Sequence, residues 1–136
     1  MKISIITATY NSSKTVRDTL ESVKNQSYRD IEHIIIDGLS SDDTLSIVND
    51  YKHVSKIISE KDKGIYDAMN KGVKNTTGEI VGILNSDDIY IDEHVINKVM
   101  RTFEDTSIDA VYGDLKYVQQ NDLNKQFPGK KILGVI

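Results

Sequence analysis

The chain alternates between short apolar runs, which are typical of strands, and amphipathic stretches, which are typical of helices. The apolar runs are rich in β-branched residues and predict strands at residues 2–7, 31–36, 56–59, 79–84 and 109–113. Between these runs, apolar residues recur at helical spacing and predict helices at residues 13–25, 45–51, 65–73 and 95–103. The predicted order is therefore β-α-β-α-β-α-β-α-β.

Strict alternation of strands and helices implies right-handed crossovers, a mostly parallel sheet and helices on both of its faces. We therefore predict an α/β fold of the Rossmann-like kind, with one domain spanning residues 1–114. The pattern weakens in residues 115–136, where the stretch from Asp114 to Lys131 is polar and contains the only proline, Pro128. We expect an irregular tail there, because such a segment has little apolar surface to bury.

Polar residues follow each of the first four predicted strands. They are Thr9 to Asn11, Asp37, Glu60 to Gly64, and the pair Asp87 and Asp88. Ligands of open α/β sheets bind beyond the carboxyl ends of the strands. The sequence therefore predicts that four polar loops converge at one edge of the sheet.

The composition is that of an ordinary soluble protein of one domain, with 136 residues and a net charge of −4. The negative charge argues against nucleic acid as the main partner. The chain has no cysteine, which excludes disulfides and thiolate chemistry. Its first apolar stretch, residues 3–8, is too short for a signal peptide or a membrane span, so we expect a cytoplasmic protein.

Asp87 and Asp88 follow the apolar run from Ile80 to Leu84 with no basic residue beside them. Two adjacent carboxylates repel each other, and a hard cation such as Mg²⁺ or Mn²⁺ would relieve that repulsion. Such ions bind proteins through one or two carboxylates together with substrate phosphates. The alternative is that both residues cap the next helix or turn, where aspartate is common.

The usual nucleotide-binding fingerprints are absent. The chain has no G-x-x-x-x-G-K-[ST] segment, and its glycines never fall into G-x-G-x-x-G spacing. A P-loop enzyme and a dinucleotide oxidoreductase are therefore disfavoured. His33, His53 and His94 lack the spacing of a zinc site, and we expect His33, inside a strand, to be structural.

Four segments carry a resemblance to family 2 glycosyltransferases, in the order and spacing of that family. They are Ser4 to Asn11, Ile36 to Thr44, Asp62 to Gly72 and Gly78 to Asp88, and the resemblance covers residues 2–113. It implies the GT-A fold and transfer of a sugar, with inversion, from a nucleotide-diphospho-sugar donor. It also implies a role in polysaccharide or glycan biosynthesis.

The resemblance implies roles for individual residues. Ala8, Thr9 and Tyr10 match residues that stack on or line the nucleobase of the donor. Asp37 matches an aspartate that lies beside the base.

For the phosphate end of the donor, Asp87 resembles the residue that touches the ribose, and Asp88 resembles the metal ligand of the family's DXD-like motif. A divalent cation there, Mn²⁺ or Mg²⁺, would stabilise the charge that develops on the leaving diphosphate. Lys61 and Lys63 lie in a loop at the same edge and would add positive charge.

The chain departs from the family pattern in two places. Many relatives have a second aspartate at Gly38 and a glycine at Leu39, so the nucleobase contact and the donor base stay open. The family's catalytic base matches no residue here, since Asp109 and Asp114 are better interpreted as turn residues. We expect a truncated acceptor region, donor binding without efficient transfer, and self-association through an uncovered sheet edge.

The resemblance further implies a glycan or lipid-linked acceptor, which leaves peripheral contact with a membrane open. Two alternative functions remain. One is a nucleotide-sugar-binding fragment without transfer activity. The other is a receiver-like phospho-acceptor domain, which also gathers aspartates at strand ends and in which Lys116 would be the lysine after the fifth strand.

Overall fold

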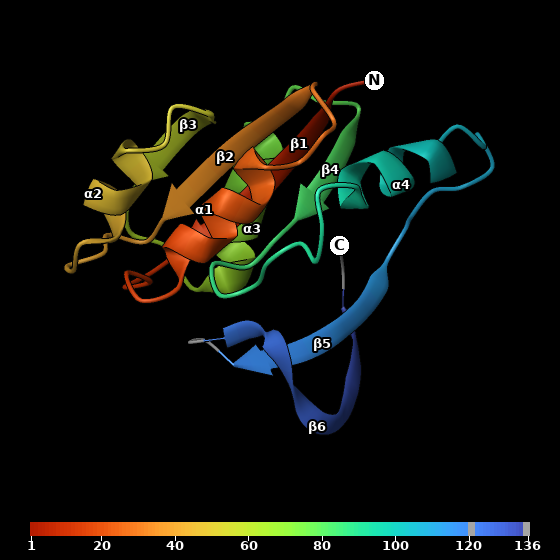
Figure 1. The fold of residues 1–136 in the computed structure, drawn as a ribbon. Helices are drawn as coiled ribbons and strands as arrows, with labels where there is room; N and C mark the ends of the chain where they lie inside the picture. Colours follow the sequence, from red (N-terminus) through yellow and green to blue (C-terminus); the bar gives the residue numbers. More distant parts are fainter. Residues whose placement is uncertain (120–121, 135–136) are drawn as a thin grey trace.

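The computed structural model describes residues 1–119 and 122–134, and within them it shows a parallel sheet, surrounding helices and a separate hairpin (Figure 1). The strands of the sheet are β1 (Ile3–Thr9), β2 (Ile31–Asp37), β3 (Val54–Ser59) and β4 (Ile80–Ile83). The helices are α1 (Val16–Lys24), α2 (Thr44–Asn49), α3 (Ile65–Lys74) and α4 (Val95–Thr102). These elements lie within a few residues of their predicted bounds, and the α/β prediction is confirmed.

The strands lie in the order β3-β2-β1-β4, and every pair is parallel. The central strand is β1, whose residues Ile3, Ile5 and Ile6 are at most 1% exposed. The chain moves outward from β1 to β3 and then returns to add β4 on the other side of β1. In receiver-like domains β1 lies between β2 and β3 instead, so this strand order contradicts the phospho-acceptor alternative.

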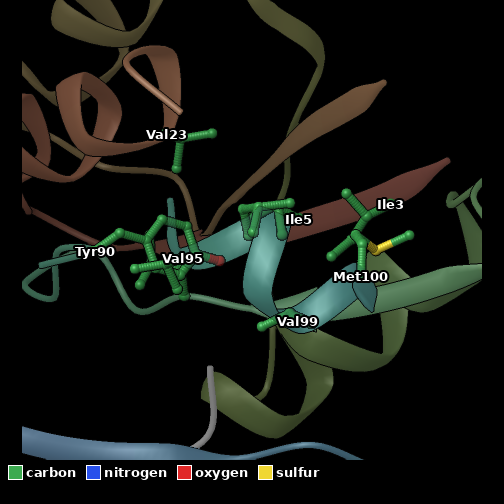
Figure 2. Packing of buried hydrophobic residues seen from close by; sticks show 9 residues of the cluster. Ile3, Ile5, Val23, Tyr90, Val95, Val99 and Met100 are labelled. Atoms are coloured by element: carbon green, nitrogen blue, oxygen red, sulfur yellow. The ribbon is translucent and has the colours of Figure 1, made fainter. Parts of the chain in front are cut away.

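One face of the sheet is covered by α1, α2 and α4. On that face, Ile3 and Ile5 pack against the apolar side of α4, whose Val95, Val99 and Met100 belong to the same buried cluster (Figure 2). Ile35 of β2 lies on the same face, in a cluster with Val16, Leu20, Val48 and Tyr51 of α1, α2 and the residues after α2. Burying these side chains is the main favourable contribution to folding.

The opposite face is covered by α3. Ile6, Ile34 and Ile36 form a buried cluster with Ala68 of this helix. A Cβ atom at Gly72 would lie 2.5 Å from Cγ2 of Ile6, so glycine allows the backbone of α3 to lie close against β1. The prediction of helices on both faces is confirmed.

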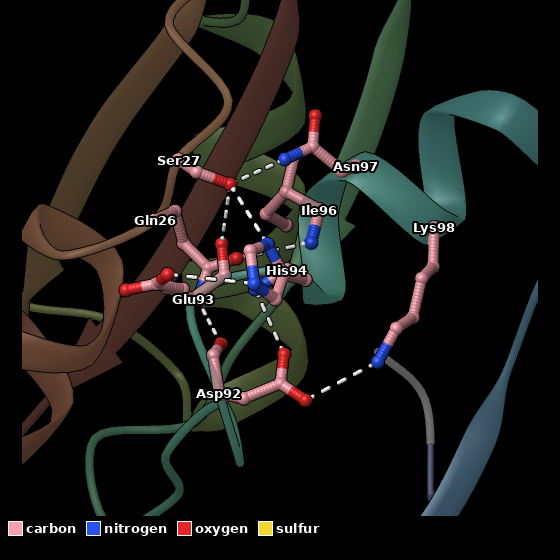
Figure 3. Close-up of polar contacts among 8 residues, drawn as sticks. All are labelled: Gln26, Ser27, Asp92, Glu93, His94, Ile96, Asn97 and Lys98. Carbon is pink, nitrogen blue, oxygen red and sulfur yellow. Dashed lines mark hydrogen bonds and ion pairs between the residues drawn. The ribbon is translucent and has the colours of Figure 1, made fainter.

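The N-terminus of α4 is held by Gln26, which follows α1 and is only 9% exposed. The residue before α4, His94, makes no side-chain cap hydrogen bond. Instead, Oε1 of Gln26 accepts a 3.0 Å hydrogen bond from the backbone N–H of Ile96, and Nε2 donates to the carbonyl of Asp92 at 2.6 Å (Figure 3). Gln26 therefore supplies the partner that a helix start requires.

Two α1 residues extend this contact along the segment before α4. Thr19 Oγ1 donates a 2.7 Å hydrogen bond to the carbonyl of Asp88, and the backbone N–H of Tyr90 donates to Ser22 Oγ at 3.2 Å. The three side chains of Thr19, Ser22 and Gln26 all bind backbone atoms. We call these three residues the α1 polar stripe.

The predicted fifth strand at residues 109–113 is wrong. Residues 109–112 have no regular structure, and Val111 packs against the α4 cluster through its side chain instead of pairing with a strand. The prediction of an irregular tail is also wrong, because β5 (Gly113–Gln119) and β6 (Asp122–Gly134) form an antiparallel pair that stands apart from the main sheet in Figure 1. Two antiparallel strands can form each other's backbone hydrogen bonds without a buried apolar run. The polar composition of this segment therefore did not exclude strands.

Within the described residues, no helix has both the length and the apolar character needed to cross a membrane.

Candidate functional site

The loops that follow the parallel strands meet at one edge of the sheet and form a cleft of about 660 Å³, a size typical of ligand sites. The arrowheads of β2 and β4 in Figure 1 point toward this edge. The residues that line the cleft are Ala8, Thr9, Tyr10, Ser12, Gly38, Leu39, Lys61, Asp62, Gly64, Ile65, Ala68 and Ser86.

Asp37 is the last residue of β2 and is fully buried. Its carboxylate accepts hydrogen bonds from Thr9 Oγ1 at 2.8 Å, from Ser40 N and Oγ at 3.0 and 2.5 Å, and from Ser59 Oγ at 2.9 Å. Burial by itself raises the pKa of Asp37, but these hydrogen bonds outweigh burial and lower the pKa below its ordinary value. Asp37 therefore ties together the ends of three strands, and its predicted role beside a nucleobase stays a prediction.

The loops after β1 and β2 are bonded to each other at the cleft. The backbone N–H of Asn11 donates to Ser40 Oγ at 2.8 Å, and Asn11 Oδ1 accepts from the backbone N–H of Ser41 at 2.8 Å. Asn11 and Leu39 have positive φ angles, 47° and 61°. Asparagine tolerates this conformation, whereas leucine is strained there by roughly 1–2 kcal/mol. The conformation at Leu39 is one that glycine adopts without cost.

The turn after β4 carries the two adjacent carboxylates. Ser86 lines the cleft and its Oγ lies 2.9 Å from Ser12 Oγ, so this turn is joined to the loop after β1. Asp87 is exposed, and Asp88 is half-buried and accepts a 3.3 Å hydrogen bond from Asn85 Nδ2. Burial and then the charge of Asp87 raise the pKa of Asp88 above its ordinary value, while the Asn85 hydrogen bond opposes the rise.

The loop between β3 and α3 is held by Lys71 of α3. Its Nζ donates to the carbonyl of Lys61 at 2.8 Å and forms ion pairs with Glu60 at 3.3 Å and Asp67 at 3.4 Å. The backbone N–H of Lys63 donates to Asp67 at 2.9 Å. Of the two lysines considered from the sequence, Lys61 lines the cleft and Lys63 does not.

Three of the residues predicted for the site, Ala8, Thr9 and Tyr10, therefore lie together on the cleft wall. Asp37, at the end of β2, and Lys63, Asp87 and Asp88, in the loops at this edge, are not among its lining residues. The prediction missed several residues that do line it, among them Leu39, Asp62, Ile65 and Ser86. These four stand in the segments that carry the resemblance, but local sequence does not reveal which way a loop side chain points.

The pair Asp87 and Asp88 fits a divalent cation chemically, since a hard cation binds carboxylate oxygens and would offset the burial and then the repulsion by Asp87 that raise the pKa of Asp88. No group of three or more His, Asp or Glu side chains that could hold a metal ion occurs within residues 1–119 and 122–134. A cation at this pair would therefore need further oxygen ligands from a bound molecule or from water.

Comparison with known proteins gives consistent results. The sequence model of Glycosyl transferase family 2 matches residues 4–132. UDP-Glc:alpha-D-GlcNAc-diphosphoundecaprenol beta-1,3-glucosyltransferase WfaP from Escherichia coli is 39% identical over 100 residues, which are 71% of this chain and 39% of WfaP. Poly-beta-1,6-N-acetyl-D-glucosamine synthase from Staphylococcus epidermidis is 36% identical over 115 residues, which are 82% of this chain and 28% of the synthase.

The fold is shared with solved structures. The crystal structure of S. aureus TarS 1-349 in complex with UDP-GlcNAc matches with a TM-score of 0.71 and 29% sequence identity, covering 76% of this chain and 31% of TarS. The chain therefore spans less than two fifths of each of these three proteins, from 28% to 39%.

Proposed function

The chain belongs to glycosyl transferase family 2, and on that premise we propose that it binds the nucleotide-diphospho-sugar donor of a glycosyltransferase in glycan or polysaccharide assembly. Two relatives support this ligand class: WfaP is named for UDP-Glc, and TarS is solved with UDP-GlcNAc. The synthase from Staphylococcus epidermidis, named for poly-beta-1,6-N-acetyl-D-glucosamine, supports the link to polysaccharide.

The observation that carries the proposal is the position of the cleft. It lies beyond the carboxyl ends of the parallel strands, lined by the loops after β1, β2 and β3, the start of α3 and one residue after β4, and open α/β sheets bind their ligands at this end of the strands. Tyr10, 67% exposed, presents an aromatic ring to the cleft. Ser86 joins the cleft to the turn that carries Asp87 and Asp88. A nucleotide could thus place its base near Tyr10 and its diphosphate near the two carboxylates.

We propose that Asp88 holds Mg²⁺ or Mn²⁺ together with oxygens of the donor diphosphate, and that Asp87 contacts the ribose. The cation would neutralise charge on the diphosphate as the bond to the sugar breaks. We also expect inversion at the sugar, as the family resemblance implies. The residues of this chain would supply binding, orientation and the carboxylate ligand of the cation.

A donor-binding unit without transfer activity is the second candidate function, and one observation favours it. Asp109 lines a separate, mainly apolar cavity of about 160 Å³ between β4 and α4, so it does not face the cleft. Asp114 lies exposed on β5. We assign no catalytic base. The glycan or lipid-linked acceptor, the cytoplasmic location with peripheral membrane contact, and self-association stay predictions.

Thermal unfolding in the presence of UDP, GDP, TDP and their sugars, each with Mn²⁺ and with a chelator, tests the proposal. A ligand at one hundred times its dissociation constant should add about 2.7 kcal/mol to the free energy of unfolding. Inorganic diphosphate controls for a general effect of anions. No stabilisation by any nucleotide would refute donor binding, whereas nucleotide release that rises with added acceptor would favour a complete transferase over the second candidate.

A further inference from the structure

The hydroxyl group of Ser12, in the loop after β1, joins two sides of the cleft. Its Oγ accepts a 3.2 Å hydrogen bond from the backbone N–H of Tyr10 and lies 3.3 Å from the carbonyl oxygen of the same residue. It also lies 2.9 Å from Oγ of Ser86, which is 74 residues away in the turn after β4. All three residues line the cleft. The loop with the exposed aromatic ring and the turn with the two carboxylates therefore meet at this pair of hydroxyl groups.

Backbone hydrogen bonds hold both members of the pair in place. The backbone N–H of Ser12 donates a 2.8 Å hydrogen bond to Oγ1 of Thr44, which is fully buried. The backbone N–H of Asp88 donates to the carbonyl of Asn85 at 3.0 Å and so closes the turn around Ser86. The two hydroxyl groups are therefore in position before a ligand arrives, which lowers the entropy cost of binding one.

The protons of the pair can be arranged in two ways, because a serine hydroxyl donates one hydrogen bond and accepts two. In the first arrangement, Ser12 donates to the carbonyl of Tyr10 and Ser86 donates to Ser12. In the second, Ser12 donates to Ser86, and the proton of Ser86 is left for an acceptor in the cleft. Ser86 Oγ has no other hydrogen-bond partner within residues 1–119 and 122–134. A ligand that accepts hydrogen bonds therefore stabilises the second arrangement.

On the basis of the proposed donor binding, we propose that Ser86 donates a hydrogen bond to an oxygen of the donor diphosphate, and that Ser12 is the positioning residue that orients it. Phosphate oxygens accept hydrogen bonds, and a hydrogen bond to an ionised oxygen is stronger than one between neutral groups. The Tyr10 N–H and the two hydroxyl groups then all donate toward the ligand, and such chains strengthen each of their bonds. This hydroxyl and the cation proposed at Asp88 would bind the same diphosphate.

Calorimetric titration of the full chain in Mn²⁺ tests the contact. The probes are whichever of UDP and GDP binds the wild type better, and the corresponding nucleoside, measured by competition against the diphosphate. We expect Ser86→Ala to weaken diphosphate binding about tenfold, the ratio that one hydrogen bond to a charged group supplies, and to change nucleoside binding less than about threefold. Ser86→Thr keeps the hydroxyl and should bind the diphosphate within about threefold of the wild type.

A double-mutant cycle tests the role of Ser12. Ser12→Ala should also weaken diphosphate binding, because the hydroxyl of Ser86 then loses the group that orients it. Combined with Ser86→Ala it should add less than about threefold, since both changes remove one shared interaction. Ser13→Ala, in the same loop, is the control and should bind like the wild type, because Ser13 bonds Asp42 through its backbone N–H.

An unchanged diphosphate affinity in Ser86→Ala, or an equal loss for diphosphate and nucleoside, would overturn the phosphate contact while leaving donor binding intact. Losses that simply add in the double variant would overturn the positioning role of Ser12. Absence of binding of the wild type to every nucleotide would instead refute donor binding and this inference with it.

Discussion

The Thr9 hydroxyl donates a 2.8 Å hydrogen bond to the buried carboxylate of Asp37, and this contact joins the end of β1 to the end of β2 beside the cleft. Thr9 itself is 3% exposed and lines the cleft. The wall of the candidate site is therefore also part of the buried core. We expect substitutions at these residues to change both the stability of the protein and its ligand binding.

We expect Asp37→Asn to lower the free energy of unfolding by about 1–3 kcal/mol, because an amide cannot accept all the hydrogen bonds that Thr9, Ser40 and Ser59 donate. Urea unfolding at neutral pH measures the change. Asp30→Asn is the matched control, since Asp30 is exposed. Equal stability of the two variants would show that the buried hydrogen bonds contribute nothing measurable.

Gly72→Ala should destabilise the protein even though alanine favours helices. The new Cβ would lie 2.5 Å from Ile6 Cγ2, and overpacking of a core costs about 1–3 kcal/mol, against a gain of about 1 kcal/mol from helix propensity. Asn70→Ala, at an exposed position of the same helix, should be neutral or slightly stabilising. A more stable Gly72→Ala in urea unfolding would mean that α3 can move away from β1.

Removing the side chain that holds the start of α4 should weaken the fold. Gln26→Ala leaves the backbone N–H of Ile96 without its acceptor, and an unpaired buried donor costs about 1–3 kcal/mol. The neighbouring Asn25→Ala, at an exposed position, is the control. Hydrogen exchange at Ile96 gives a local readout, since its amide should exchange faster in Gln26→Ala and at the wild-type rate in Asn25→Ala.

Stability should fall as the pH is lowered below neutrality. His33 is fully buried, and its ring nitrogens are hydrogen-bonded to Thr7 and to His53. Burial, together with the charge of His53, lowers the pKa of His33 to about 3. The unfolded chain, in which histidine has its ordinary pKa of about 6.5, then binds more protons than the folded one between pH 6.5 and 3. The contribution of His33 to the free energy of unfolding is fully present above pH 6.5 and is lost as the pH falls from 6.5 toward 3.

Between pH 7 and 5 the loss from His33 should be about 2 kcal/mol. Urea unfolding at the two pH values measures it, and carboxylates with lowered pKa, such as Asp37, stay ionised over this range. His33→Gln should remove much of the difference, while His94→Gln, at an exposed ring, should retain it. A wild type with the same stability at both pH values would contradict a neutral, buried His33.

Asp88→Asn should abolish the metal dependence of nucleotide binding. In the wild type we expect UDP or GDP affinity to fall at least about tenfold when Mn²⁺ is chelated, because two carboxylates and a diphosphate would repel each other without the cation. Asp87→Asn should have a smaller effect if its contact is with the ribose. Asp92→Asn is the control, since the carboxylate of Asp92 forms an ion pair with Lys98 of α4. Identical metal dependence in wild type and Asp88→Asn would exclude Asp88 as a ligand.

The elements from β1 to α4 were predictable because their signals are local. Ile34, Ile35 and Ile36 are all buried, although successive side chains point to opposite faces of the sheet. A continuous apolar run in the sequence predicts a strand that is covered on both faces. Residues 109–112 show the limit. Val111 is apolar and β-branched, but a strand also needs a partner edge, and its side chain is satisfied by the α4 cluster instead.

The site was predictable to the extent that its residues follow strands. The segment Thr9 to Asn11 was identified because it follows β1, the resemblance singled out Tyr10 within it, and Tyr10 lines the cleft. Contacts between distant positions were not predictable. Asp37 accepts a hydrogen bond from Ser59, which is 22 residues away, and His33 contacts His53, which is 20 residues away. Such pairs depend on the register between strands, and hydrophobic periodicity does not encode that register.

The α1 polar stripe has a consequence for how this protein can change over evolution. Thr19, Ser22 and Gln26 bind backbone atoms of the segment that leads from Asp88 to α4. These hydrogen bonds go to backbone atoms, so they do not depend on which side chains the segment carries. Exposed residues of the segment, such as Ile91, 71% exposed, can therefore be exchanged without loosening the turn. Substitutions there would leave Asp88, whose carbonyl Thr19 binds, in its place.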